Sequence, residues 1–195
     1  MARHLTSIDP GYFESMFRET SDPWDLETSA YEQAKFEDSI EALSGRRYAT
    51  GFEVGCAKGV LTVKLAERCA ALLAIDVSET ALDAARRRTR NLDRVTLGNM
   101  AFPRTTPEGR FDLIVLSEVA YYWDDGDLRR AADWLKSHLM PGGDLLLVHY
   151  TGETDYPQSG NEAVTKLSTL FGERIIVLTA HRRPCYRLDL WRREP

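Results

Sequence analysis

The chain has 195 residues, of which 43% are hydrophobic and 28% are charged, and its formal net charge at pH 7 is −5. This length and balance predict one soluble globular domain over residues 1–195 and exclude a disordered chain. The negative net charge argues against a nucleic-acid-binding surface, and no apolar run approaches the ~18 residues of a membrane span. We therefore expect neither a nucleic acid nor a membrane as a partner, and the oligomeric state is left open.

Cysteine and histidine usage indicates a reducing compartment and no metal. The three cysteines stand far apart and form no CxxC pair: Cys56, Cys69 and Cys185. The segment MARHLTSIDP has no apolar stretch typical of a signal peptide, so we expect reduced thiols and a cytoplasmic location. The four histidines form no HxxxH pair and no Cys/His cluster, so no metal site is predicted.

The first 44 residues are predicted to be a helical cover that precedes an α/β core over residues 45–195. Residues 11–20 suit one helix, and the segment SDPWDLET interrupts it because Pro23 fixes its own φ and restricts Asp22. A second helix is predicted to begin at Ser29, which with Glu32 forms a capping-box pattern.

From residue 47 onward, apolar runs alternate with helical patterns. Such alternation predicts a doubly wound, mostly parallel sheet of seven strands. The two closing strands follow one another with only the short connection HRRP between them, so we expect them to pair antiparallel. The helix over 78–90 carries a basic run that we interpret as a solvated face: Arg86, Arg87, Arg88 and Arg90. Strands are predicted over 48–54, 71–77, 94–99, 111–119, 144–150, 173–180 and 185–191.

The turn FEVGCAKG at residues 52–59 follows the first strand of this sheet. Ligands of such sheets bind beyond the carboxyl ends of the strands, where glycine lets the backbone approach them closely. A phosphate-binding P-loop is excluded because Lys58 is followed by Gly59 and Val60, with no hydroxyl for Mg²⁺. A dinucleotide fingerprint is disfavoured because Gly55 and Gly59 are spaced GxxxG rather than GxGxxG.

Two acidic residues at strand ends indicate which ligand the turn takes. A carboxylate at Glu53 repels a phosphate but attracts an ammonium or a sulfonium group. Asp76 ends the second strand, where its carboxylate can accept bonds from both hydroxyls of a ribose, as in dinucleotide folds. A cationic cofactor that carries adenosine satisfies both residues, and S-adenosylmethionine fits.

Several stretches resemble known methyltransferases. FEVGCAKG, IDVS, LGNM, FDLIVLSEV and LMPGGDLLLVHY, in that order, resemble the class I S-adenosylmethionine-dependent methyltransferases over residues 47–195. DPW at 22–24, TSAYEQAK at 28–35, SEVAYYW at 117–123 and VHY at 148–150 resemble the nodulation-type (NodS) methyltransferases. That family N-methylates the free amine of a de-N-acetylated chitooligosaccharide.

The resemblance implies cofactor contacts at thirteen positions. The glycine turn surrounds the methionine part, Asp76 takes the ribose hydroxyls and Val77 packs on the adenine. Asn99 stands where the family usually has an acid near the adenine, so the hydrogen bond there lacks a charge. The predicted cofactor contacts are Trp24, Tyr31, Glu53, Gly55, Cys56, Ala57, Gly59, Asp76, Val77, Asn99, Met100, Ser117 and Glu118.

The acceptor side is predicted after the fourth and fifth strands. Tyr121 and Tyr122 can hydrogen-bond a sugar hydroxyl, although the run YYW can also be an aromatic packing cluster. An amine must be neutral to attack, and Glu118 or His149 can take its proton. His149 also has a purely structural interpretation. Because positioning supplies much of the acceleration in such a displacement, a dedicated base is not required.

The sequence thus predicts an S-adenosylmethionine-dependent methyltransferase that releases S-adenosylhomocysteine. The favoured acceptor is the free amine of an amino sugar or de-N-acetylated chitooligosaccharide. An O-methyltransferase acting on a sugar or natural product is the alternative within the class. An NAD-type oxidoreductase and a non-enzymatic binding module are the alternatives outside it. Glu53 and the missing third glycine argue against the oxidoreductase.

Overall fold

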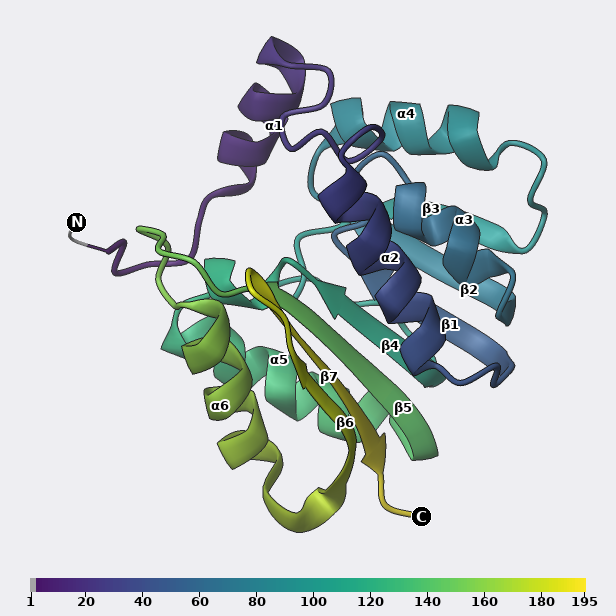
Figure 1. Cartoon of the computed structure of the whole chain (residues 1–195), viewed down its shortest axis with the longest axis vertical. Helices are drawn as coiled ribbons and strands as arrows, with labels where there is room; N and C mark the ends of the chain where they lie inside the picture. Colours follow the sequence, from purple (N-terminus) through teal and green to yellow (C-terminus); the bar gives the residue numbers. More distant parts are fainter. Residues whose placement is uncertain (1–2) are drawn as a thin grey trace. The chain divides into compact units, whose positions relative to one another are not determined.

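The structure is a computed structural model that describes residues 3–195, and the contacts within it divide the chain into two units. Residues 9–101 form one, here called the N-terminal unit (purple to teal in Figure 1). The chain up to residue 8 and residues 102–195 form the other, here called the C-terminal unit. The single domain expected over residues 1–195 stays a prediction.

The N-terminal unit contains a three-stranded parallel sheet with β2 between β3 and β1. In the pairing of β1 with β2, Glu53 lies opposite Ala74, and in that of β2 with β3, Asp76 lies opposite Asn99. Asp76 and Asn99 therefore lie side by side where β2 and β3 end. The elements are α1 (Pro10–Glu19), α2 (Ala30–Ala42), β1 (Tyr48–Val54), α3 (Val60–Ala66), β2 (Cys69–Asp76), α4 (Glu79–Thr89) and β3 (Val95–Asn99).

Capping residues set where the helices of this unit begin. Ser29 caps α2 and Ser78 caps α4, each by accepting a bond from a backbone N–H three residues further on. Asp9 caps α1, and Pro10 occupies its first position, where a missing N–H leaves no bond unmade. The predicted helix starts are thus confirmed to within a residue.

The C-terminal unit holds four strands in the order β4-β5-β7-β6 (Figure 1). β4 and β5 run parallel, whereas β7 pairs antiparallel with both β5 and β6. The predicted antiparallel pairing of the two closing strands is confirmed. The elements are β4 (Phe111–Ser117), η1 (Ala120–Tyr122), α5 (Asp125–His138), β5 (Leu139–Tyr150), α6 (Gly160–Phe171), η2 (Gly172–Arg174), β6 (Ile175–Arg182) and β7 (Tyr186–Arg193).

Two strand boundaries differ from those that the sequence predicts. β5 begins at Leu139 rather than at residue 144, because the backbone enters an extended conformation directly after α5 and Pro141 is tolerated near a strand start. β4 ends at Ser117 rather than at residue 119, because Glu118 adopts φ +59°, which no strand accommodates.

Both units bury apolar cores along their strands. The core of the N-terminal unit includes Phe52, Leu72 and Ile75, each at most 1% exposed. In the C-terminal unit, Leu113 and Leu146 are fully buried. Within residues 3–195, no helix is long and apolar enough to cross a membrane.

Candidate functional site

The glycine turn has three residues with positive φ at alternating positions. Gly55 has φ +75°, Ala57 has φ +45° and Gly59 has φ +77°. The N–H groups of Gly55 and Cys56 donate to the carbonyl of Ile75 at 2.8 and 2.9 Å, which fixes the turn against β2. Ala57 thus holds the left-handed conformation that glycine favours, although the sequence shows only a GxxxG spacing.

Replacing Gly59 with alanine is expected to destabilise the N-terminal unit by about 2–3 kcal/mol. The residue has φ +77°, and an added Cβ would lie 3.2 Å from the Cβ of Ala85 and 3.3 Å from its Cα. Ala57→Gly is the matched control, because it relieves a left-handed alanine and should not destabilise the fold. Chemical denaturation monitored by circular dichroism measures both variants. Equal stability of Gly59→Ala and the wild type would show that the turn tolerates a side chain there.

Asp76 connects the glycine turn to the start of α4. Its Oδ2 accepts a bond from the Ala57 N–H and its Oδ1 accepts one from the Ser78 N–H, both at 2.8 Å. Burial raises the pKa of Asp76, while the N–H groups of Ser78 and Ala57 act in the opposite direction. A buried carboxylate with both oxygens fixed in this way can accept further bonds from hydroxyl groups.

Glu53 is a buried acid at the end of β1, with 2% of its surface exposed. Burial raises the pKa of Glu53 to about 7, and the negative charge of the Asp76 carboxylate adds to this shift. Its Oε2 is buried and has no hydrogen-bond partner within residues 3–195. Since a buried carboxylate oxygen without a donor is unfavourable, this atom suits a ligand that brings a cationic N–H group.

The residues predicted near the adenine lie together at the ends of β2 and β3. The Asn99 side-chain amide donates to the carbonyl of Val77 at 3.1 Å, and the Met100 N–H donates to the carbonyl of Asp76 at 3.0 Å. Cys56 is 4% exposed, and burial raises the pKa of its thiol well above the ordinary value, so it stays protonated.

Lys58 binds the glycine turn to the segment between α1 and α2. Its Nζ lies 2.9 Å from a carboxylate oxygen of Glu27 and 3.8 Å from one of Asp22, and only 7% of the residue is exposed. The neighbouring Trp24 packs edge-on against Phe17 at 5.4 Å between ring centroids. The segment that carries Trp24 is therefore held beside the turn.

Two further contacts hold the helices of the predicted cover. Glu14 of α1 accepts bonds from the hydroxyls of Ser78 and Thr80 at 2.7 and 2.8 Å, and these bonds lower the pKa of Glu14 to about 2. Tyr31, in the first turn of α2, is 37% exposed, and the Lys35 ammonium lies 5.2 Å from its ring centroid. Tyr31 is thus accessible for the contact predicted for it.

In the C-terminal unit, Glu118 directly follows Ser117 at the end of β4. Its Oε2 accepts bonds from the Tyr121 hydroxyl and from the Tyr150 N–H, both at 2.8 Å. Its φ of +59° is uncommon for a residue with a side chain and marks a constrained position. The carboxylate is therefore oriented by two donors from different segments.

An aromatic cluster surrounds this carboxylate. Tyr121 contacts Tyr122 edge-on at 4.6 Å and stacks on Tyr156 at 5.6 Å between ring centroids. Burial raises the pKa values of Tyr121 and Tyr122 well above the ordinary value, so both hydroxyls remain donors. The sequence did not indicate Tyr156, because it lies in the loop after β5 without a motif of its own.

His149 is fully buried near the end of β5. Its Nε2 accepts a bond from the Ala120 N–H at 3.2 Å, so the neutral ring holds its proton on Nδ1. The ring also contacts Tyr121 edge-on at 5.7 Å. This arrangement positions the turn after β4, in agreement with the structural interpretation of this residue; its predicted catalytic role stays a prediction.

Comparison with known families decides the relationship of this chain. The family model described as nodulation protein S (NodS) matches residues 16–174. The chain belongs to the NodS family. The predicted resemblance is thereby confirmed.

Individual curated proteins are similar to the chain. The chain is 36% identical to nodulation protein S of Rhizobium tropici over 127 residues, which are 64% of this chain and 53% of that protein. It is 28% identical over 144 residues to a cypemycin N-terminal methyltransferase of Streptomyces sp, covering 72% of this chain and 56% of that protein. The chain thus spans about half the length of these curated relatives.

A solved NodS structure establishes the fold. The N-methyltransferase NodS of Bradyrhizobium japonicum WM9, solved with S-adenosylhomocysteine, has a TM-score of 0.83 and 27% identity and covers 96% of this chain and 100% of its own. The predicted fold, the seven-stranded mixed sheet of class I methyltransferases, is therefore confirmed.

Proposed function

We propose that this NodS-family chain is an S-adenosylmethionine-dependent N-methyltransferase acting on a free amine of a small molecule. The single observation that carries the proposal is the buried carboxylate of Glu53 beside the glycine turn. Its Oε2 has no hydrogen-bond partner among residues 3–195. An ammonium group satisfies that oxygen, whereas the diphosphate of NAD brings only negative charge. The NAD-type oxidoreductase is accordingly disfavoured.

The N-terminal unit supplies the residues that would hold the cofactor. Glu53 receives the ammonium of its methionine part, and Asp76 receives the ribose hydroxyls. Val77, Asn99 and Met100 accommodate the adenine. When bound, S-adenosylmethionine supplies a methyl group activated by a sulfonium. Its product, S-adenosylhomocysteine, keeps the same ammonium and ribose and therefore serves as a binding probe.

We assign to Glu118 the role of the base that takes a proton from the amine of the methyl acceptor. A carboxylate can take the proton that an ammonium must lose before its nitrogen attacks. The two donors on Oε2 keep this group oriented. His149 is less suited to that role because its Nε2 already accepts the Ala120 N–H. Tyr121 and Tyr122 would bind the acceptor through their rings and hydroxyls.

The acceptor proposed is an amino sugar or a de-N-acetylated chitooligosaccharide. The NodS relationship supports a nitrogen acceptor, because the solved NodS protein is an N-methyltransferase by its name, and the second curated relative is named an N-terminal methyltransferase. Incubation of the enzyme and cofactor with a de-N-acetylated chitooligosaccharide should give a product heavier by one methylene in mass spectrometry. A matched fully N-acetylated oligosaccharide should remain unchanged. Methylation of both would favour the O-methyltransferase instead.

Replacing Glu118 with glutamine is expected to lower kcat by about 10- to 100-fold, because the amide cannot take a proton. The affinity for S-adenosylhomocysteine should change much less than kcat, since glutamine keeps the size of the side chain and an oxygen that can still contact the cofactor. Single-turnover rates and calorimetric titration separate the two effects. Tyr150→Phe is the control, because it keeps the backbone N–H that donates to Glu118. An unchanged kcat in Glu118→Gln would assign the proton to solvent.

A further inference from the structure

The N-terminal unit contains a cavity of about 620 Å³ that the proposed reaction does not use. Its walls come from α1, from the segment between α1 and α2, from Lys58 of the glycine turn, from α4, and from Arg90 and Asn91 directly after α4. A volume of this size lies within the range of small-molecule sites, roughly 300–1,000 Å³.

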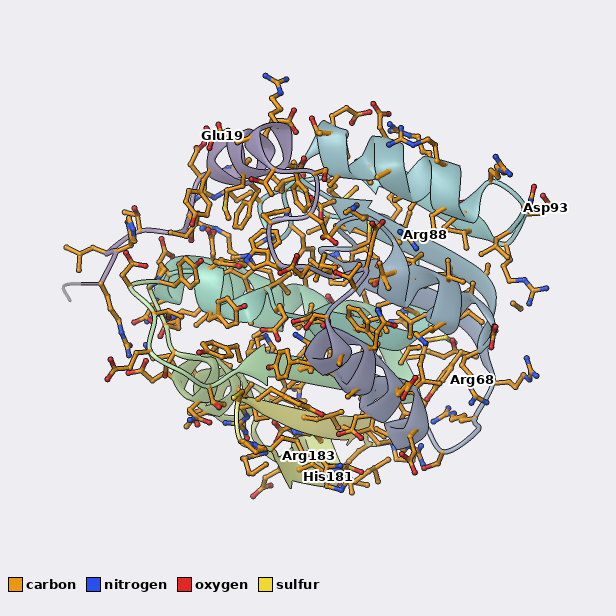
Figure 2. All side chains as sticks on the ribbon, turned by 45° about the horizontal axis from the view of Figure 1, so that its top comes forward. Glu19, Arg68, Arg88, Asp93, His181 and Arg183 are labelled. Atoms are coloured by element: carbon orange, nitrogen blue, oxygen red, sulfur yellow. The ribbon has the colours of Figure 1, made fainter. Side chains whose placement is uncertain are left out.

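The charge of the cavity wall is mostly positive. Only one carboxylate among the described residues lines it, that of Glu27. Four cationic side chains line it: Lys58, Arg87, Arg88 and Arg90. Glu27 already pairs with two of them, since Lys58 lies 2.9 Å from it and Arg88 also forms an ion pair with it. Arg88 additionally donates to the Lys58 carbonyl at 2.9 Å. Figure 2 labels Arg88, which belongs to α4, and Asp93, which follows the helix.

The remaining two arginines have no acidic partner in the part of the chain that the structure describes. Arg90 is the C-cap of α4 and lies three positions after Arg87, so the two occupy one side of the end of the helix. Neither forms a hydrogen bond or ion pair with any residue from 3 to 195. Their neighbour Arg86, outside the cavity, instead pairs with Glu79 at 2.6 Å and Asp83 at 2.8 Å.

The cavity also offers an apolar wall and neutral polar groups. Phe17 and Ala81 are buried and line it together with Ala84, while Ser21 and Asn91 supply a hydroxyl and an amide. The first turn of α4 is not the anion site, because Glu14 already accepts the Thr80 N–H and hydroxyl. The uncompensated charge therefore lies further along the helix.

We propose that this cavity binds a small molecule that carries a phosphate or diphosphate group. Guanidinium groups match the geometry of phosphate oxygens and remain charged at any physiological pH, so Arg87 and Arg90 receive the anion. The apolar wall accommodates the organic part of the same molecule. The basic run is exposed, as the sequence predicts, and Arg87 and Arg90 within it have a second role where they line the cavity, separate from the cofactor residues Glu53 and Asp76.

The test uses pyrophosphate as the probe, titrated into the full chain at low ionic strength by calorimetry. We expect saturable binding at one site. Arg87→Gln and Arg90→Gln should each weaken it about five- to tenfold, because each removes one charge-assisted contact. Arg86→Gln removes the same charge from the same helix outside the cavity and should change the affinity less than twofold.

Equal losses in all three variants, or no saturable binding of pyrophosphate to the wild type, would overturn the proposal. All three should bind S-adenosylhomocysteine as the wild type does, which shows that they are folded. Conversely, Glu53→Gln and Asp76→Ala should keep pyrophosphate binding. Failure of the phosphate site and failure of the proposed methyltransferase are therefore distinguished.

Discussion

Replacement of Asp76 by alanine is expected to weaken the binding of S-adenosylhomocysteine by about 100- to 1000-fold. Two contributions add. The ribose hydroxyls lose a charged acceptor, and hydrogen bonds to charged groups are worth about 1.5–3 kcal/mol each. The Ala57 and Ser78 N–H groups lose the carboxylate that fixes the glycine turn to the start of α4. Calorimetric titration measures the loss.

Two companion variants separate these contributions. Asp76→Asn keeps one acceptor oxygen and the shape of the side chain, so its affinity should lie between those of the wild type and Asp76→Ala. Asp93→Ala removes an exposed carboxylate of the same unit and should bind as the wild type does. Wild-type affinity in Asp76→Ala would mean that the end of β2 does not contact the ribose.

Glu53 is expected to make cofactor binding strongly dependent on pH. Its pKa of about 7 means that much of the carboxylate is protonated at pH 6. The ammonium of S-adenosylhomocysteine prefers the ionised form, so the affinity should rise about tenfold between pH 6 and pH 8 and then level off. Glu53→Gln should remove this dependence and leave a weak, flat affinity. Calorimetric titrations over this pH range measure both.

The same pKa has the opposite effect on the stability of the ligand-free protein. The folded state holds the Glu53 proton more tightly than the unfolded chain, where the pKa is 4.5. Its stabilising contribution is therefore complete below about pH 4.5 and is lost as pH rises through 7, a difference of about 3 kcal/mol. At pH 8, Glu53→Gln should be more stable than the wild type in denaturant titration. A lower stability than the wild type would show that the ionised Glu53 carboxylate does not destabilise the fold.

The sequence was sufficient for the fold because its signals were local. β1 falls where the run YATGFEV predicts it, and the capping serines Ser29 and Ser78 mark the helix starts. The two acids at strand ends could also be predicted from the sequence, since a strand places its last residues at a defined edge of the sheet. Glu53 and Asp76 lie at these ends, as the alternating pattern requires.

Other parts of the site depend on contacts that no local pattern encodes. Ala57 adopts a positive φ because Asp76, nineteen residues away, accepts its N–H. The stacking of Tyr156 on Tyr121 joins the loop after β5 to η1, and no sequence pattern near Tyr156 predicts this contact. The basic run on α4 is exposed, as its pattern predicts, but the cavity beside it could not be predicted because residues of α1 and the following segment build it. The roles predicted for the remaining site residues stay predictions.

Selection of a cationic ligand that carries adenosine is the central role proposed for Glu53 and Asp76. Titration of the protein at pH 8 with S-adenosylhomocysteine and with NAD, side by side in a calorimeter, tests it most directly. We expect saturable binding of one S-adenosylhomocysteine per chain and no measurable binding of NAD. Binding of NAD without binding of S-adenosylhomocysteine would contradict this role.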